Sequence, residues 1–277
     1  MALVAVCGNF SAASGRGSPF HSLDAAMLRF LLIIAISLAV SGCFAVRGAK
    51  TLAPNWFGFV EISKDIYVDK AMPSSQRIEV IKTVRSAQAR VSQFFGGLDG
   101  HPKIFACSTE ECFVANDFGA TPKGQAYGSS ALMLSPRGED IVIISHELTH
   151  IELHTRIGAF RSWHAIPSWF DEGLAVLVSE DPRYAENAWL QATDNGRNAP
   201  KLENIGGMLG KGGWLLSYGT ARREVGEWYS DAKHAGLMQL IAEVKNGVGF
   251  DTALNNISSK TASNPALQRD VPKSARP

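Results

Sequence analysis

The apolar and polar positions of this chain follow strand-like patterns first and helix-like patterns afterwards. Apolar residues alternate with polar ones over residues 51–69, which predicts one or two strands. Over residues 74–95 the apolar positions recur at helical spacing and stop at a Gly-Gly pair, which predicts a helix. Short apolar runs predict a strand at residues 103–106 and another within residues 124–135.

The second half of the chain is predicted to be mainly helical. Residues 141–153 are apolar nearly all round, which is typical of a helix buried in the middle of a domain. A second buried helix is expected after Pro167. The polar stretch up to Lys201 predicts a surface loop, and further helices are expected over residues 214–229 and 236–254. Strands followed by helices predict an α+β fold, with a loose polar tail over residues 258–277.

The amino-terminal stretch has the pattern of an export signal. A short positive start at Met27 precedes the apolar run 31–40, which is too short for a comfortable membrane span. An uncleaved anchor and a buried core strand are the alternatives. The residues Val40-Ser41-Gly42-Cys43 resemble the bacterial lipobox. That resemblance implies that Cys43 is lipidated and that the lipid attaches the chain to a membrane. Residues 1–26 are then either a gene-start overcall or an unusual leading segment.

Composition excludes some classes of function. The chain has 277 residues, 45% of them hydrophobic, so it has enough apolar residues to build a core. Its 27 basic and 26 acidic residues nearly balance, so we expect no nucleic-acid partner. In an exported protein Cys107 and Cys112 are expected to form a local disulfide, the alternative being half of a second metal site.

The residues that indicate chemistry are His146, Glu147 and His150, which form the pattern H-E-x-x-H. Side chains four residues apart lie on one face of a helix, so the two imidazoles can bind one metal ion. Glu147 then lies beside the ion, where it can accept a proton. Two buried histidines held by hydrogen bonds are the structural alternative, but that arrangement does not require the carboxylate.

A catalytic zinc needs a third protein ligand and one open position. His154 lies two turns from His146, about 12 Å along the axis of a regular helix, so the two cannot bind one ion together. His164, in a predicted loop, is an alternative on the substrate side. The buried carboxylate pair Asp171 and Glu172 needs a cation or hydrogen-bond donors, or it is a charge pair at a helix start.

These residues resemble a known family. H-E-L-T-H followed by P-S-W-F-D-E-G-L-A is similar to the gluzincin zinc metallopeptidases, in particular the peptidase MA-like group. The resemblance implies a zincin-like fold, in which a small mixed sheet packs on the motif helix, and Zn²⁺ as the cofactor. It implies that Glu172 is the third ligand. Asp171 is a candidate acceptor for a histidine N–H.

The resemblance also implies a group that stabilises the oxyanion. Tyr218, in the helix after the third ligand, is the candidate, and a packed core tyrosine is the alternative. Arg222 or Arg223 is expected to share that role or to bind a substrate carboxylate. The strand within residues 124–135 is expected either to pair with an extended peptide or to be an ordinary sheet strand.

The expected organisation is an export segment over residues 1–43, with the signal itself at 27–43, followed by the peptidase domain. Residues 44–140 form its amino-terminal α/β part, and residues 141–257 its helical part. The predicted function is zinc-dependent peptide hydrolysis at the periplasmic or outer-membrane side of the cell envelope. A non-catalytic metal-binding lipoprotein and a zinc hydrolase of non-peptide amides are the alternatives.

Overall fold

A computed structural model describes residues 51–116, 122–158, 161, 164–202 and 213–263. The chain divides into two units, residues 1–48 and 49–277, and all described residues lie in the second. The predicted signal over residues 27–43, with Cys43, therefore lies outside the described residues. Within the described part, no helix is both long and apolar enough to cross a membrane.

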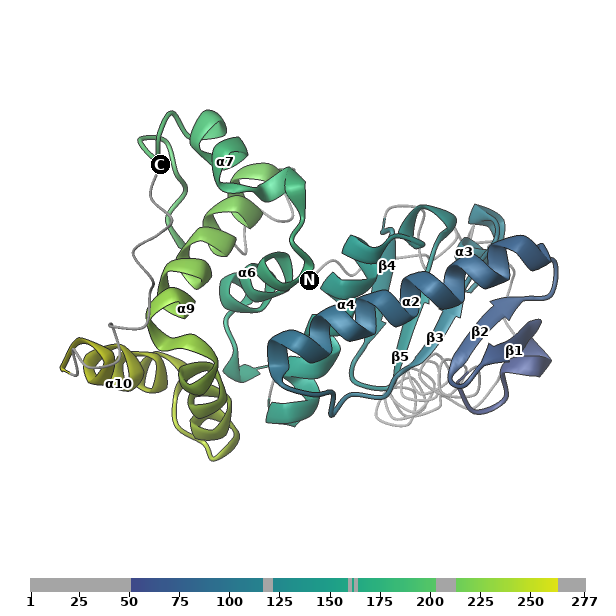
Figure 1. Ribbon diagram of the computed structural model, residues 1–277, viewed down its shortest axis with the longest axis horizontal. Coiled ribbons are helices and arrows are strands. Elements are labelled where there is room, and N and C mark those ends of the chain that lie inside the picture. The colour runs from purple at the N-terminus through teal and green to yellow at the C-terminus, as the bar shows by residue number, and fades with distance from the viewer. Residues whose placement is uncertain (1–50, 117–121, 159–160, 162–163, 203–212, 264–277) are drawn as a thin grey trace, which may run out of the picture. The chain divides into compact units, whose positions relative to one another are not determined.

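The first half of the described chain forms a five-stranded mixed sheet in the order β1-β2-β3-β5-β4 (Figure 1). Its strands are β1 (Phe59–Ser63), β2 (Ile66–Asp69), β3 (Lys103–Ala106), β4 (Gly124–Tyr127) and β5 (Ala131–Leu134). The inner strands β2, β3 and β5 are parallel, whereas β1 and β4 are antiparallel edge strands. The α+β class is confirmed.

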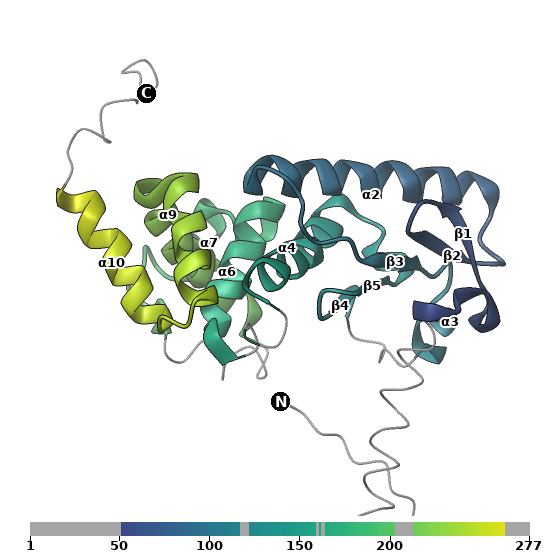
Figure 2. The same ribbon diagram turned by 90° about the horizontal axis from the view of Figure 1, so that it is seen from below.

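Both faces of the sheet are buried, and alternate side chains of each inner strand serve different cores. In β3, Ile104 belongs to the main core and Phe105 to a smaller one on the opposite face. Helix α2 (Ser74–Phe95) lies along the main-core face, while the short helix α3 (Glu110–Ala115) lies on the other side, as Figure 2 shows. This two-sided burial explains why β5 is apolar at all four positions.

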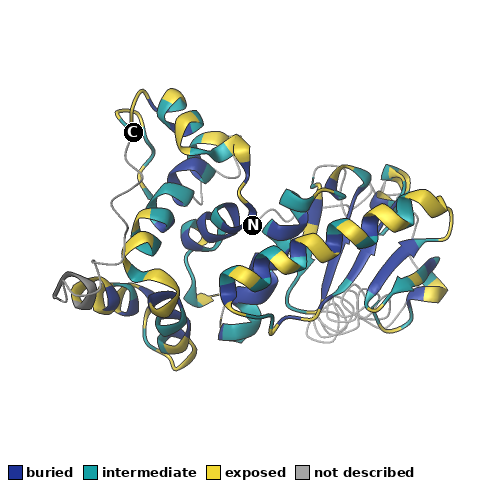
Figure 3. Ribbon diagram, viewed as in Figure 1, coloured by how far each residue is buried: buried dark blue, intermediate teal, exposed yellow. Residues whose placement is uncertain are grey.

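Two long helices connect the sheet to the helical half. Helix α4 (Ile141–Ile157) packs against α2 and β4, and α6 (Ser168–Ser179) packs between α4 and α9 (Trp214–Lys245). Figure 3 shows α6 mostly buried, whereas α2 exposes one side to solvent. The described part of this half also contains η3 (Pro182–Tyr184), α7 (Glu186–Ala192) and α10 (Phe250–Ser263).

A glycine allows α6 and α9 to approach closely. A Cβ at Gly173 would lie 2.4 Å from the carbonyl oxygen of Ala221, so a larger residue would push the two helices apart. The neighbours of Gly173 and Ala221 along the chain include Glu172 and Tyr218. The close approach of the two helices therefore decides how near these two side chains come to each other.

Three details differ from the sequence-based expectations. The stretch 124–135 forms a hairpin of two strands, because Gly128 adopts a left-handed conformation (φ 54°) and turns the chain back. The polar stretch before Lys201 is not only a loop, since it contains α7. The tail predicted from residue 258 is wrong up to Ser263, because buried Ala253 and Ile257 anchor α10 in the core.

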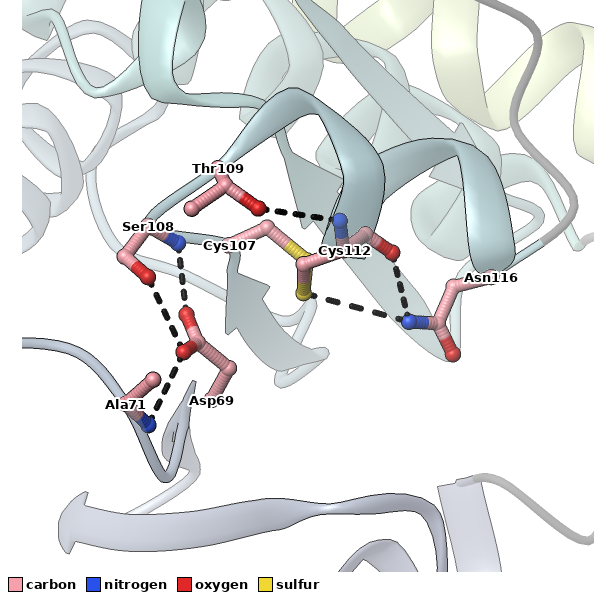
Figure 4. The surroundings of a disulfide bond; sticks show 7 residues. All are labelled: Asp69, Ala71, Cys107, Ser108, Thr109, Cys112 and Asn116. Carbon is pink, nitrogen blue, oxygen red and sulfur yellow. Dashed lines mark hydrogen bonds between the residues drawn. A yellow bond between two sulfur atoms is a disulfide. The ribbon is translucent and has the colours of Figure 1, made fainter.

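The predicted disulfide between Cys107 and Cys112 is present and follows β3 directly (Figure 4). Thr109 caps α3 by accepting a hydrogen bond from the Cys112 backbone N–H. Asp69, at the end of β2, accepts hydrogen bonds from the backbone N–H and the hydroxyl of Ser108. The disulfide thus stabilises the short segment that joins β3 to α3.

Reduction of this disulfide is expected to lower the free energy of unfolding by about 2 kcal/mol, because the bond closes a short loop and limits the unfolded chain. Urea unfolding followed by circular dichroism, with and without reductant, measures the difference. The double variant Cys107→Ser/Cys112→Ser should show no effect of reductant. Equal midpoints for oxidised and reduced wild type would contradict the prediction.

Candidate metal centre

The motif helix α4 starts at a side-chain cap. Asp140 accepts a hydrogen bond from the backbone N–H of Val142 at 2.7 Å. Ile144, Leu148 and Ile151 then pack in the main core, and another side of the helix is less buried. His146, Glu147 and His150 lie on that half-buried side.

Helix α6 brings a carboxylate to the two imidazoles. The Nε2 atoms of His146 and His150 lie 3.1 Å apart. The Oε2 atom of Glu172 lies 3.3 Å from Nε2 of His146 and 3.6 Å from Nε2 of His150. Glu172, 22 positions after His150 in the sequence, thus completes one compact triangle of donor atoms.

The triangle has the dimensions of one face of a tetrahedral metal site. Ligand atoms that bind zinc at about 2.1 Å with tetrahedral angles lie about 3.4 Å from one another. The Oε2 atom of Glu172 is buried and has no hydrogen-bond partner among the described residues, which is costly for a carboxylate oxygen. A cation that the three atoms share would satisfy it. These residues therefore fit a zinc ion.

Asp171 fixes the orientation of one imidazole. Its Oδ1 accepts a hydrogen bond from Nδ1 of His150 at 2.7 Å, so the neutral ring carries its lone pair on Nε2, the atom in the triangle. Its Oδ2 accepts a second hydrogen bond, from Nε2 of His154 at 2.9 Å. The predicted acceptor role of Asp171 toward a histidine N–H is therefore seen in the structure.

His154 is the residue whose place the sequence did not predict. It lies too far along the helix to share an ion with His146, and in the structure it contacts Asp171. His150, His154 and Asp171 form a second group whose ligand atoms are close enough for a metal, but hydrogen bonds already join those atoms. The only sequence signal that could have linked His154 to the site is its i, i+4 spacing from His150. Its actual partner, Asp171, lies on another helix, which this spacing cannot indicate.

Glu147 lies between the motif helix and the edge of the sheet. Its Oε2 accepts a hydrogen bond from the backbone N–H of Ala126 in β4 at 2.9 Å. A Cβ at Gly124 would lie 3.2 Å from Cγ of Glu147, so the glycine leaves little spare room there. Because β4 is an edge strand, the carboxylate lies beside backbone groups that are not paired within the sheet.

Helix α9 places Tyr218 close to the triangle. Its ring centroid lies 6.1 Å from that of His146. Burial, followed by the nearby Glu172 and Tyr184, raises the pKa of the Tyr218 hydroxyl above its usual value. The hydroxyl is therefore protonated near neutral pH and able to donate a hydrogen bond.

The charges around the triangle favour a cation. Burial alone would lower the pKa of His150, but the carboxylates of Asp171 and Glu172 outweigh burial and raise it well above 6.5. Burial opposes the charged form of Glu172 as well, yet His150 and His146 lower its pKa to about 2. The carboxylates thus stabilise positive charge at the imidazoles, and a metal ion supplies such charge.

Arg222, Arg223 and His164 are the other candidates for contact with a substrate. Arg223 forms ion pairs with Glu186 and Glu227, so its guanidinium is already engaged. Arg222 is half-buried and has no hydrogen-bond or ion-pair partner in the described part of the chain. His164 is exposed and lines a pocket at the start of α10. The groups of described residues that could share a metal ion do not include it.

No model of a known protein family matches the chain, and no curated protein matches it. A metal centre at this place is favoured by the donor triangle, the buried oxygen of Glu172 without a hydrogen-bond partner and the hydrogen bond between His150 and Asp171. These are features of the chain's own residues.

Replacement of Asp171 by Asn or Ala is expected to lower zinc affinity by about 10- to 100-fold, because His150 loses the carboxylate that orients its ring. His154→Leu, which removes one of the two hydrogen bonds to Asp171, should lower the affinity less. Competition with a chelator of known affinity measures both effects.

The matched control is Asp251→Asn, which changes an exposed carboxylate at the start of α10 and should leave zinc affinity unchanged. If Asp171→Ala and Asp251→Asn bind zinc equally well, Asp171 has no part in the metal centre.

Proposed function

We propose that this chain is a zinc-dependent metallopeptidase of the gluzincin type, with a zincin-like fold. The observation that carries the proposal is the triangle of His146, His150 and Glu172, with Glu147 on the same side of α4. A purely structural histidine pair would not need two further carboxylates at this place. Three protein ligands leave one position open, as hydrolytic zinc sites require.

The bound zinc would supply a Lewis acid that polarises a carbonyl group and lowers the pKa of a water molecule toward neutrality. Glu147 is the general base, which takes a proton from the attacking water and later gives a proton to the leaving amine. Glu147 accepts a hydrogen bond from the Ala126 backbone N–H at 2.9 Å, and this bond holds its carboxylate at the edge of β4.

Tyr218 is the residue proposed to stabilise the oxyanion. Its hydroxyl keeps its proton because burial and the nearby Glu172 raise its pKa. A hydrogen-bond donor held in place in a partly desolvated site stabilises developing negative charge more than the same donor does in water. The close packing of α6 and α9 at Gly173 keeps Tyr218 near the triangle.

The edge strand β4 is proposed to align the substrate. Among the described residues β4 pairs with β5 alone in the sheet, and we propose that its other edge receives an extended peptide. The hydrogen bond between Ala126 and Glu147 shows that this edge runs past the proposed base. A peptide added as a further strand would pass its backbone carbonyls close to Glu147.

The cell envelope is the proposed location, because residues 27–43 resemble a lipoprotein signal. A lipid on Cys43 would attach the enzyme to the membrane and leave its peptidase domain in water. The Cys107–Cys112 disulfide is consistent with an oxidising compartment. The expected substrates are peptides or proteins, and no nucleic-acid partner is proposed.

Glu147→Gln is expected to lower kcat for peptide hydrolysis by at least about 10²-fold and to leave zinc content unchanged, because the amide cannot accept the proton of the attacking water. Cleavage of a peptide library, followed by mass spectrometry, and metal analysis of the same preparation measure both.

The matched control is Glu79→Gln, which changes an exposed carboxylate on α2 and should retain full activity. Undiminished hydrolysis by Glu147→Gln would refute the mechanism. A wild type that binds zinc and cleaves no peptide would favour the non-catalytic lipoprotein or the hydrolase of non-peptide amides.

A further inference from the structure

Two large apolar side chains are almost fully exposed at the start of the described chain. Leu52 is 83% exposed and Trp56 is 88% exposed, more than any other exposed large hydrophobic residue of the described part. Both lie in the short segment that leads through η1 (Pro54–Phe57) into β1. A single exposed apolar residue is common on protein surfaces and would carry no inference alone. Two of them in one segment are worth following.

The backbone of this segment is fixed on the sheet. Phe57 packs against the smaller core, on the face of the sheet opposite α2. The carbonyl oxygen of Thr51 accepts a hydrogen bond from Nζ of Lys103 at 2.6 Å. The backbone N–H of Trp56 donates to the carbonyl oxygen of Ala53 at 3.1 Å. The exposed side chains are therefore carried by a held backbone.

The position of the segment in the chain indicates what covers it. Cys43, the proposed site of lipid attachment, lies nine residues before Leu52. A fully extended chain spans at most about 3.5 Å per residue, so a lipid on Cys43 keeps Leu52 within about 30 Å of the bilayer. Within the described chain, this segment is also the nearest in sequence to the proposed anchor. A membrane is thus always within reach of the two side chains.

The charges of this stretch suit an anionic bilayer surface. Arg47 and Lys50 lie between Cys43 and Leu52, and residues 43–60 contain no Asp or Glu. Basic residues beside a membrane anchor are attracted to anionic headgroups. A tryptophan ring favours the boundary between headgroups and acyl chains. One short stretch of the chain therefore combines both kinds of attraction to a bilayer.

We propose that Leu52 and Trp56 form a membrane-contact surface, which docks on an anionic phospholipid bilayer beside the lipid anchor. The inference rests on the proposed lipidation of Cys43 and goes beyond it, because a lipid alone leaves the orientation of the domain open. Docking places both apolar side chains at the boundary of headgroups and acyl chains, while the charges of Arg47 and Lys50 attract the headgroups. The face of the sheet opposite α2 then lies toward the membrane.

The test measures contact between Trp56 and lipid. The full chain is purified in detergent from the membranes of its expression host. It is then reconstituted into vesicles of phosphatidylcholine and phosphatidylglycerol, with or without lipids brominated near the headgroup. Bromine quenches tryptophan fluorescence at short range, and the chain has six tryptophans. Wild type should be quenched by the brominated vesicles, and Trp56→Phe should lose most of that quenching.

The matched control is Trp214→Phe, which changes an exposed tryptophan on α9 and should be quenched like the wild type. Thermal unfolding followed by circular dichroism should give equal midpoints for all three proteins, because both side chains are exposed. Equal quenching of Trp56→Phe and wild type would overturn the proposal. So would a wild type that the brominated vesicles do not quench.

A second measurement tests the charge of the surface. The double variant Arg47→Gln/Lys50→Gln should dock less on the anionic vesicles, by about fivefold in the docking equilibrium for each charge removed. Lys82→Gln, which changes an exposed lysine on α2, should dock like the wild type. Equal quenching of the double variant and Lys82→Gln would overturn the requirement for anionic lipid.

Mass spectrometry of the same preparation separates this inference from the proposed anchor, because it reports whether Cys43 carries a lipid. Quenching of Trp56 without a lipid on Cys43 would overturn only the anchor. A lipid on Cys43 without quenching of Trp56 would overturn only the membrane-contact surface, and the absence of both would overturn both. None of these results depends on peptide cleavage, so the peptidase proposal is tested separately.

Discussion

The interaction on which the described structure depends most is the convergence of two imidazoles and one carboxylate from two buried helices. Three donor atoms at 3.1–3.6 Å, with an oxygen of Glu172 that lacks a hydrogen-bond partner, are costly unless positive charge lies among them. A shared cation removes that cost, and an apolar core around α4 and α6 makes the cost large when the cation is missing. This cost is the physical argument for the metal centre that we propose.

The rest of the helical half supports the same place. Asp171 orients His150 through one oxygen and contacts His154 through the other, so a single carboxylate joins α6 to two turns of α4. Gly173, one residue beyond Glu172, lets α9 approach and brings Tyr218 within 6.1 Å of His146. The sheet contributes as well, since the edge of β4 holds Glu147. The proposed ligand support, base and oxyanion donor therefore come from three different elements.

Local patterns predicted the elements whose signals lie within one segment. Helix α2 begins and ends where its apolar spacing and Gly96 indicate, and the Cys107–Cys112 spacing predicted its disulfide. Features that depend on distant partners were missed. Helix α7 is held by Trp189, whose indole N–H donates to Thr220 on α9 and whose ring fills the space above Gly219. The contact of His154 with Asp171 was missed for the same reason, because spacing along α4 gives no information about what α6 brings.

The most direct test of the central claim is the zinc content of the purified wild-type protein and of Glu172→Ala, measured by inductively coupled plasma mass spectrometry after dialysis. The metal-centre account predicts one zinc ion per wild-type chain. It predicts less than about a tenth of that in the variant, which loses one of three ligands from two helices. Equal zinc content in the two proteins, or none in the wild type after exposure to zinc, would contradict it.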